Sequence, residues 1–248
     1  MILAAGALAG RTAVVSGASS GIGLAVARRL HALGASVTVL ARRSDAIAAG
    51  LGSDRLASGR LDVRSLDVTD AHAAAAALDS AELDVLVAAA GTNVAERRLE
   101  QLTPAAWATL LATNLSGVFH LVAASLPALR AARGQVIVVG SVSAAWPNRS
   151  GPGYQAAKAG VLAFTRAAAL EELEHDSGVR FSVVAPGMVD TPLLERRPEP
   201  PPTEQRARML RPEDVAETCA FLAALPPGVL VPEITLLPVA LQALGSTS

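Results

Sequence analysis

Residues 12–23 read TAVVSGASSGIG, and this stretch decides the fold that we expect. The apolar run TAVVS predicts a short buried strand, and glycines at 17, 21 and 23 lead from it into a helix that we expect to begin near Ile22. Glycine at such places permits a tight turn and lets a pyrophosphate approach backbone N–H groups at the amino end of a helix. The stretch therefore predicts a dinucleotide-binding turn, although Gly- and Ser-rich turns also occur in α/β proteins that bind no nucleotide.

The alternation of apolar runs and helix-forming segments continues along the whole chain. The runs SVTVL, LDVRSLDV, LDVLVAA, QVIVVGS, RFSVVAP and EITLLP alternate with longer segments rich in Ala and Leu. Continuous apolar strands joined by helical crossovers imply a parallel sheet with helices on both faces. We expect one α/β domain over residues 1–248, built on a doubly wound, Rossmann-like parallel sheet. The Pro-rich stretch RPEPPPTEQ, residues 197–205, falls within a segment, 191–211, that we interpret as a flap over a substrate site.

Composition excludes several classes of function. A formal net charge of -1 and 3% aromatic residues leave no basic stripe with stacking side chains, so nucleic acid is not an expected partner. The opening residues 1–11 are apolar but lack a basic segment and are too short to span a bilayer, so we expect an exposed lead-in, no membrane association and a cytoplasmic protein. One cysteine, Cys219, excludes an internal disulfide, and four scattered histidines predict no metal site.

The glycine turn also matches a second motif. Residues 17–21, GASSG, fit the G-x-S-x-G nucleophile elbow of serine hydrolases, with Ser19 as the nucleophile. An elbow of that kind follows several strands, whereas only one strand is predicted before Ser19. A serine hydrolase is therefore the lesser hypothesis.

The stretch GPGYQAAKAG, residues 151–160, holds the only tyrosine of the chain, Tyr154, and its only lysine, Lys158. All other basic residues among the 21 are arginine, so one position specifically favours an ammonium group. Residues four apart share one face of a helix, about 5–6 Å apart at Cβ. An ammonium so close to a phenol favours the phenolate, and we expect the tyrosine pKa to fall from about 10 by two or three units, toward acid–base exchange near neutral pH.

Two further polar residues lie at informative places. Ser141 ends the strand QVIVVGS, where a parallel sheet presents side chains at its carboxyl edge, and its hydroxyl can hold a substrate oxygen. Asn114, in ATNLSG, interrupts a long helical pattern where Asn costs roughly half a kcal/mol relative to Ala. We expect a local use of its amide, with a helix kink or a buried water as the alternative.

The motifs SGASSGIG, NLSG, GSVS and YQAAK, in this order and spacing, resemble those of the short-chain dehydrogenase/reductase family over essentially the whole chain. The resemblance implies that Tyr154 is the catalytic acid/base and that Lys158 lowers its pKa and holds the nicotinamide ribose. It implies that Ser141 polarises the substrate carbonyl and that Asn114 belongs to a water-linked proton relay.

The resemblance also implies a set of cofactor-binding residues. The pyrophosphate loop has Ser16 in place of the usual Thr, Asp67 and Val68 match the adenine-contacting pair, and the Val189 backbone and Thr191 side chain would hold the carboxamide. The implied set is Gly17, Ser19, Ser20, Gly21, Ile22, Gly23, Arg42, Arg43, Asp67, Val68, Ala89, Ala90, Gly91, Tyr154, Lys158, Pro186, Gly187, Val189 and Thr191.

Two departures from the family pattern stand out. The usual Asn-Asn-Ala-Gly after the fourth strand is here Ala-Ala-Ala-Gly at 88–91, which removes two amide side chains that brace the sheet edge. The carboxyl-terminal region resembles the branch with a Pro-x-x-x-Gln segment, here residues 238–242, rather than the Gly-rich ending of many tetrameric members.

The end of the second strand predicts the choice of cofactor. An acidic residue near this point, roughly 20 residues past the glycine loop, binds the ribose 2′-hydroxyl of NAD. Here that place holds Ala41, followed by Arg42 and Arg43, and a guanidinium can clamp a 2′-phosphate. We expect NADP(H) to be preferred over NAD(H), with Arg42 as the main contact. The alternative is that both arginines are simply solvated.

The predicted activity is an NADP(H)-dependent oxidoreductase that transfers a hydride between the nicotinamide and a ketone, an aldehyde or a secondary alcohol. Segments expected to line the pocket carry several arginines, which fit either a substrate with an anionic tail or a solvated flap. The resemblance implies a homodimer or homotetramer through the helices around 103–130 and 157–175. A non-catalytic NADP-sensing regulator is the other alternative, but such a protein would not need the tyrosine.

Overall fold

The computed structural model describes residues 3–42, 61–78, 82–243 and 246–247. Its centre is a seven-stranded parallel sheet in the order β3-β2-β1-β4-β5-β6-β7. This is the doubly wound α/β architecture that the sequence predicts, in one domain. The strands β1, β4, β5 and β6 are buried as expected, whereas the edge strands β3 and β7 are partly exposed. The strands are β1 Thr12–Ser16, β2 Ser36–Ala41, β3 Leu61–Ser65, β4 Val85–Ala88, β5 Gln135–Val139, β6 Arg180–Pro186 and β7 Glu233–Leu236, with a small antiparallel pair, β8 Gln242–Ala243 and β9 Ser246–Thr247.

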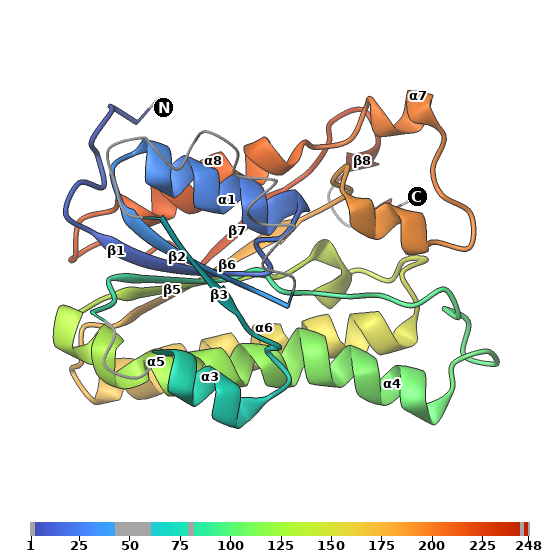
Figure 1. Cartoon of the computed structure of the whole chain (residues 1–248). Helices are drawn as coiled ribbons and strands as arrows, with labels where there is room; N and C mark the ends of the chain where they lie inside the picture. Colours follow the sequence, from blue (N-terminus) through green and yellow to red (C-terminus); the bar gives the residue numbers. More distant parts are fainter. Residues whose placement is uncertain (1–2, 43–60, 79–81, 244–245, 248) are drawn as a thin grey trace.

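Helices cover both faces of the sheet (Figure 1). Helices α1 and α8 lie on one face, and α3, α4, α5 and α6 lie on the other. The helical segments are α1 Gly21–Ala32, α3 Ala71–Leu78, α4 Pro104–Leu111, the π-helical turn η2 Ala112–Ser116, α5 Gly117–Ala132, the short η3 Val142–Ala144, α6 Pro152–Glu174, η4 Pro192–Arg196, α7 Thr203–Arg206 and α8 Pro212–Ala223.

Each face of the sheet has its own apolar core, because alternate residues of a strand point to opposite sides. Val15 of β1 packs toward α1 and α8 in one cluster, and the neighbouring Val14 packs toward α5 and α6 in the other. Cys219, a free thiol, is fully buried in the first cluster, and burial raises its pKa to about 12. The free cysteine therefore acts as a small apolar core residue.

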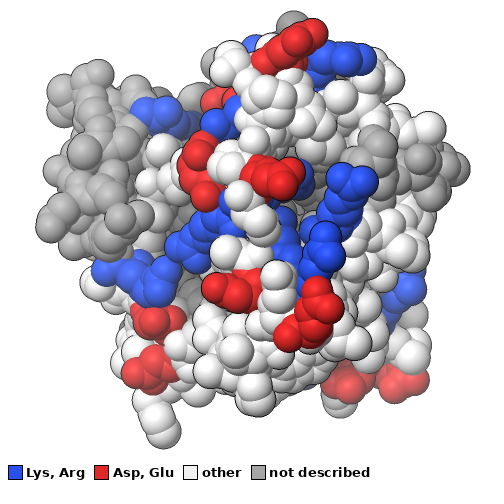
Figure 2. Space-filling view, turned by 90° about the vertical axis from the view of Figure 1, so that its right-hand side faces the viewer, with Lys and Arg blue, Asp and Glu red and all other residues white. Residues whose placement is uncertain are grey.

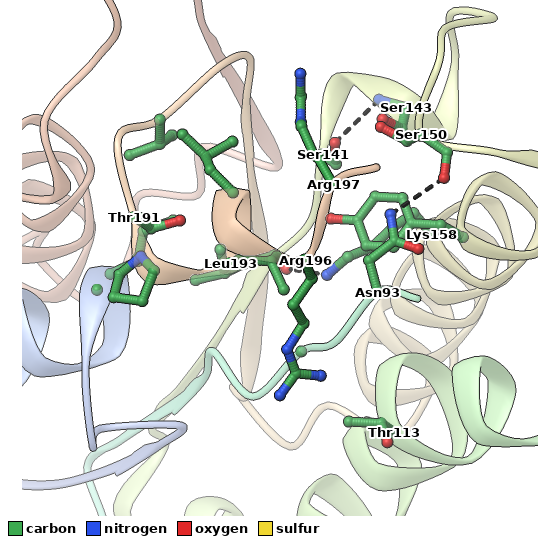
Figure 3. A pocket seen from close by; sticks show the side chains of 18 of the residues that line it. Asn93, Thr113, Ser141, Ser143, Ser150, Lys158, Thr191, Leu193, Arg196 and Arg197 are labelled. Carbon is green, nitrogen blue, oxygen red and sulfur yellow. Dashed lines mark hydrogen bonds between the residues drawn. The ribbon is translucent and has the colours of Figure 1, made fainter. Parts of the chain in front are cut away.

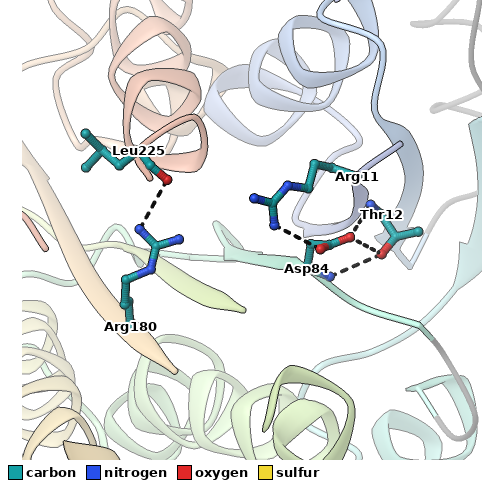
Figure 4. Close-up of polar contacts among 5 residues, drawn as sticks. All are labelled: Arg11, Thr12, Asp84, Arg180 and Leu225. Atoms are coloured by element: carbon teal, nitrogen blue, oxygen red, sulfur yellow. Dashed lines mark hydrogen bonds and ion pairs between the residues drawn. The ribbon is translucent and has the colours of Figure 1, made fainter. Parts of the chain in front are cut away.

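The strand order reverses between β1 and β4, and this reversal places a crevice at the carboxyl ends of the strands. Polar contacts tie the opposite, amino edge together (Figure 4). The Asp84 carboxylate accepts hydrogen bonds from the Thr12 backbone N–H at 2.8 Å and from Arg11 Nη1 at 3.0 Å. Arg180 Nη1 donates to the Val229 carbonyl at 3.0 Å and more weakly to the Leu225 carbonyl at 3.4 Å. The amino edge is thus braced by charge-assisted bonds, while the carboxyl edge is open to a ligand.

The helical run Pro104–Ala132 is long and apolar enough, by length and composition alone, to cross a membrane, with a mean hydropathy of 1.4 and 39% of that stretch buried. In the fold its inner face packs on the sheet, with Leu121 and Leu129 in the second apolar cluster. This packing is that of a core helix of a doubly wound domain.

Three details differ from or lie beyond the sequence expectations. The third strand ends at Ser65, so Leu66–Val68 leave the sheet and turn toward the crevice. In the lead-in, residues 4–7, 9 and 10 are exposed, Leu3 and Arg11 are half-buried, and Leu8 is buried in the first apolar cluster. Arg43 lies outside the described residues. Within the described ranges, no three His, Cys, Asp or Glu side chains gather as metal ligands.

Candidate active site

One large cavity opens at the carboxyl ends of the strands (Figure 3). The loop after each of β1, β2, β3, β4, β5 and β6 contributes to its wall, together with α6 and the segment 191–202. All of the implied cofactor and catalytic residues described by the structure line it, except Asn114, which is buried beneath the wall. Residues more than 170 positions apart in sequence therefore meet at one site, from Gly17 to Thr191.

The glycine turn has the backbone that its sequence predicts. Gly17 and Gly21 have φ of +69° and +55°, a region that favours glycine. A Cβ at Gly17 would lie 2.7 Å from the Ala90 nitrogen, so the close approach of two loops also requires glycine there. Ser20, at the N-cap of α1, makes no side-chain cap bond, and the first turn holds no acidic residue. The free N–H groups of this turn fit an anionic group such as a pyrophosphate.

The surroundings of Ser19 in this turn bear on the serine hydrolase alternative. Ser19 lines the cavity, but no histidine does among the residues that the structure describes. Without a base within reach, a serine hydroxyl is a poor nucleophile. The G-x-S-x-G match is therefore the sequence of a phosphate-binding turn rather than of a nucleophile elbow.

Ser16 compensates for the missing amide side chains after β4. Its buried hydroxyl accepts hydrogen bonds from the backbone N–H groups of Ala89 at 3.1 Å and Ala90 at 3.2 Å. These bonds hold the loop after β4 against the end of β1 through main-chain groups alone. The Ala-Ala-Ala-Gly loop thus stays bonded to the end of β1 without the two amide side chains.

Asn114 lies in the π-helical turn η2 and is fully buried. Its Nδ2 donates to the carbonyls of Thr92 at 3.0 Å and Leu110 at 2.9 Å, and its Oδ1 accepts from the Thr92 N–H at 3.0 Å. The expected local use of the amide is therefore observed. Both amide hydrogens of Asn114 are used in these bonds. A proton relay through this side chain would therefore have only the second lone pair of Oδ1, an atom that lies near Gly91, as Lys158 Nζ does.

Tyr154 and Lys158 project from the first turns of α6. Lys158 Nζ lies 5.8 Å from the centre of the Tyr154 ring and donates to the Val139 carbonyl at 2.9 Å. Ser141, at the N-cap of η3, accepts a hydrogen bond from the Ser143 N–H at 3.1 Å, and its hydroxyl lies close enough to the Tyr154 phenol to lower the pKa of that phenol. Strand β5 therefore positions the lysine through its last carbonyl and the serine just beyond its end.

The expected fall of the tyrosine pKa is not what the structure gives. Burial raises the pKa of Tyr154 above its ordinary value, and this effect exceeds the lowering by the Ser141 hydrogen bond and by the charges of Arg97 and Arg197. Burial also lowers the pKa of Lys158 to about 8. The prediction was wrong because it considered the ammonium alone, without the desolvation of both groups and without the Val139 carbonyl that holds the ammonium.

Sequence reasoning gave no individual role to three arginines of the wall. Arg97 belongs to the loop after β4, and Arg196 and Arg197 end η4. Arg196 Nη1 donates to Thr92 Oγ1 at 2.6 Å, which ties η4 to the loop that Asn114 holds. Figure 3 shows Arg196 and Arg197 leaving their turn in opposite directions. The pocket-lining segments were predicted to contain arginines, but only the fold shows which of them approach the tyrosine.

At the other end of the cavity, Ala41 ends β2 and Arg42 is exposed on the wall. The Arg42 carbonyl accepts a hydrogen bond from Ser65 Oγ at 3.3 Å, which holds the ends of β2 and β3 together. The backbone N–H of Thr69 holds the pKa of the Asp67 carboxyl below its ordinary value, with smaller contributions from the Thr69 hydroxyl and the Arg42 charge. Arg42 and Asp67 thus flank the same end of the site.

The segment after β6 is fixed by the carboxyl-terminal region. Gln242 Oε1 accepts a hydrogen bond from the Met188 N–H at 2.7 Å, and Val189 bridges to Leu210. A Cβ at Gly21 would lie 3.3 Å from the Thr191 side chain, so Thr191 stands directly over the glycine turn. The glutamine of the Pro-x-x-x-Gln segment therefore braces the residues that the resemblance assigns to the carboxamide.

Comparisons with known proteins agree with this geometry. A family model for short chain dehydrogenases matches residues 11–201. The cis-4-hydroxycyclohexanecarboxylate dehydrogenase of Sinomonas cyclohexanicum is 40% identical over 231 residues, which cover 88% of this chain and 91% of the relative. An alcohol dehydrogenase of Thermococcus sibiricus, solved in complex with 5-hydroxy-NADP, is 30% identical with a TM-score of 0.83, covering 94% of this chain and 98% of its own.

A metagenomic short-chain oxidoreductase solved in complex with NADP is 31% identical, with a TM-score of 0.79, and the match covers 93% of this chain and 97% of that one. Sequence and fold agree with these relatives over most of the chain. The protein therefore belongs to the short-chain dehydrogenase/reductase family.

Proposed function

We propose that this oxidoreductase interconverts a secondary alcohol and its ketone, or an aldehyde and its alcohol, with NADP(H) as the cofactor. The observation that carries the proposal is that Tyr154, Ser141 and Lys158 line the same cavity wall, with the Ser141 hydroxyl close enough to lower the pKa of the Tyr154 phenol and Lys158 Nζ 5.8 Å from the centre of the Tyr154 ring. A relative that is 40% identical is named for the oxidation of a ring alcohol, which supports a secondary alcohol as the reacting group.

In this proposal Tyr154 is the acid/base. When bound, the nicotinamide supplies or accepts the hydride. In the reduction, the Tyr154 phenol gives its proton to the substrate oxygen, while the Ser141 hydroxyl holds the same oxygen and orients it. Burial keeps the phenol protonated at neutral pH, which suits a proton donor. In the oxidation the phenolate takes that proton back, stabilised by Ser141 and by nearby arginine charges.

Lys158 and Asn114 position these groups. One N–H of the Lys158 ammonium is used on the Val139 carbonyl, so two remain for the ribose hydroxyls that the resemblance implies. Asn114 fixes the loop at Thr92 by two hydrogen bonds, and Arg196 fixes η4 to the same loop. We propose that the segment 191–211 acts as the flap over the substrate, since residues 191–202 line the cavity.

Turnover tests the proposal directly. The purified chain should consume NADPH with a panel of ketones and aldehydes, or reduce NADP+ with secondary alcohols, as followed by nicotinamide absorbance. A Tyr154→Phe variant should not. A chain that binds NADP(H) but turns over no member of a broad panel would support the NADP-sensing alternative.

The preference for NADP(H) rests on Ala41 and Arg42. Two solved relatives contain NADP or a derivative of it. A charge-assisted hydrogen bond to a 2′-phosphate is worth roughly 1.5–3 kcal/mol, so we expect at least a tenfold preference for NADP(H) in kcat/KM. The double change Ala41→Asp with Arg42→Ala should reverse it, whereas Arg64→Ala, which removes an exposed arginine bonded to the Ala77 carbonyl, should not. Equal use of both cofactors by the unchanged enzyme would contradict the assignment.

We further propose a homodimer or homotetramer that forms through α5 and α6. Phe119 on α5 is 51% exposed and packs edge-on against Phe164 of α6, and Leu170 and Leu173 of α6 are also exposed. Exposed apolar side chains grouped on two adjacent helices favour burial in an interface. Light scattering after gel filtration gives the mass, and Phe119→Glu should shift it to that of a monomer. A cytoplasmic location is supported by the single, buried cysteine, because no internal disulfide requires an oxidising compartment.

A further inference from the structure

Two arginines stand beside the proposed acid/base without an acidic partner. Arg97 and Arg197 come from loops a hundred residues apart and line the cavity that holds Tyr154. Both guanidinium charges lower the pKa of the Tyr154 phenol, so both lie within electrostatic reach of the reacting group. Figure 2 shows the face over this cavity, where Lys and Arg side chains gather at the centre with Asp and Glu beside them.

The hydrogen bonds of this pair involve neutral groups only. Arg97 Nε donates to the Val94 carbonyl at 2.9 Å, and its Nη2 lies 3.4 Å from the Arg196 carbonyl. Over the described part of the chain, no carboxylate forms an ion pair with Arg97 or Arg197. Glu96 and Glu199 also line the cavity, but both are exposed, and no ion pair joins either of them to Arg97 or Arg197 among the residues that the structure describes.

Arg206, in the proposed flap, is an arginine with a structural role. Arg206 donates to Asp190 at 2.7 Å and to Glu195 at 2.6 Å, so its charge is balanced by two carboxylates. Arg97 and Arg197 have no such balance, although both are partly buried. Burial lowers the pKa of both, that of Arg97 to about 10, and the charge of Arg197 adds to the lowering at Arg97. Two like charges that are partly desolvated on one cavity wall are costly unless an anion joins them.

The position of Arg97 is also fixed by its backbone. Gly151, which precedes α6, has φ of +91°, and a Cβ there would lie 2.5 Å from the Arg97 carbonyl oxygen. Asn93 Nδ2 donates to the Ser150 carbonyl at 3.1 Å and joins the same two loops. The loop that carries Arg97 is therefore packed against the start of the helix that carries Tyr154, and the guanidinium is preorganised relative to the phenol.

We propose that Arg97 and Arg197 together bind a carboxylate carried by the substrate, so that the enzyme acts on hydroxy acids and the corresponding oxo acids. The inference rests on the proposed oxidoreductase function of the same site. A planar guanidinium group matches a carboxylate through two parallel hydrogen bonds. A carboxylate bound by both arginines would offset positive charge that the fold leaves unpaired. The carboxylate would be held at the two arginines and the reacting hydroxyl at Tyr154. The distance between these two points would then select substrates of a matching length.

The test compares charged and neutral versions of one substrate. A graded series of hydroxy acids and the primary amides of the same acids is assayed by nicotinamide absorbance with the unchanged enzyme and with Arg97→Gln, Arg197→Gln and the double variant. The ratio of kcat/KM for acid over amide is the readout, because any effect of the arginines on the Tyr154 pKa acts on both substrates and cancels in the ratio.

We expect the unchanged enzyme to prefer one acid over its amide by at least tenfold, and each variant to lose at least tenfold of that ratio. Arg197→Lys, which keeps the charge but loses the fork, should retain part of it. Arg64→Gln is the matched control, since Arg64 is exposed, bonds to the Ala77 carbonyl, does not line the cavity and should leave the ratio unchanged.

The outcomes separate this inference from the proposed function. Turnover of alcohols with equal rates for acids and amides, or variants that leave the ratio intact, would overturn the carboxylate site while the oxidoreductase assignment stands. No turnover of either class by the unchanged enzyme would count against the proposed function. Inhibition by inorganic phosphate but not by simple carboxylates, lost in Arg97→Gln, would overturn the carboxylate in favour of a phosphorylated substrate.

Discussion

Replacement of Asn114 by alanine should destabilise the fold at the wall of the active site. The change removes three hydrogen bonds to main-chain groups of Thr92 and Leu110, all buried. Each bond contributes about 1 kcal/mol net, and a buried group left unpaired costs about 1–3 kcal/mol. The higher helix propensity of alanine offsets roughly 0.5 kcal/mol of this loss. We therefore expect a loss of about 2–3 kcal/mol in the free energy of unfolding, or roughly 4–12 °C in Tm for a chain of this size.

Urea unfolding followed by circular dichroism, at one fixed protein concentration, measures this loss. Thr109→Ala is the control, because its hydroxyl makes one exposed bond within α4, to the Ala105 carbonyl, and its removal should cost under about 0.5 kcal/mol. Turnover should fall as well, since Thr92 also anchors Arg196 of η4. An Asn114→Ala variant as stable as the Thr109→Ala control would refute the view that these bonds hold the loop.

Three further predictions concern the residues of α6. Tyr154→Phe should lower kcat by about 10²- to 10⁴-fold, with NADPH affinity by fluorescence titration within a few fold, since only the proton donor is lost; a variant with more than a tenth of the original rate would contradict the assignment. Lys158→Arg should be severely impaired in steady-state assays, because the planar guanidinium has no room at a site that is 4% exposed and bonded to the Val139 carbonyl; an unchanged rate and pH profile would show that any cation suffices. The pKa of Lys158 is about 8 in the folded chain against 10.5 as the ordinary value, so the unfolded chain binds more protons between these pH values and stability should rise with pH there. From pH 8 to 10.5, the free energy of unfolding of the unliganded protein in urea should rise by up to roughly 3 kcal/mol more than that of the Lys158→Met variant. A difference between the two proteins that does not change with pH would mean that the ammonium is solvated.

The sequence alone determined the features that depend on neighbours along the chain. Glycines 17 and 21 have the positive φ that their spacing predicts, because no other residue adopts that backbone at so little cost. The apolar runs form parallel strands, and the central ones are buried, since only a sheet covered on both faces buries every residue of such a run. The four-residue spacing of Tyr154 and Lys158 places both on one face of α6, as helical geometry requires.

Only the tertiary structure decided the features that depend on contacts across the chain. The pKa of Tyr154 moves up rather than down because burial outweighs nearby charges, and burial cannot be computed from a spacing of four residues. Ser16 replaces two absent amide side chains by bonding to the backbone 73 and 74 positions away. Arg97 and Arg197 look like any other solvated arginines in the sequence. They gain a role only because the loops after β4 and η4 line one cavity with the tyrosine. The electrostatic effect of a charged side chain depends on its distance to other charges and on the exclusion of water, and the fold sets both.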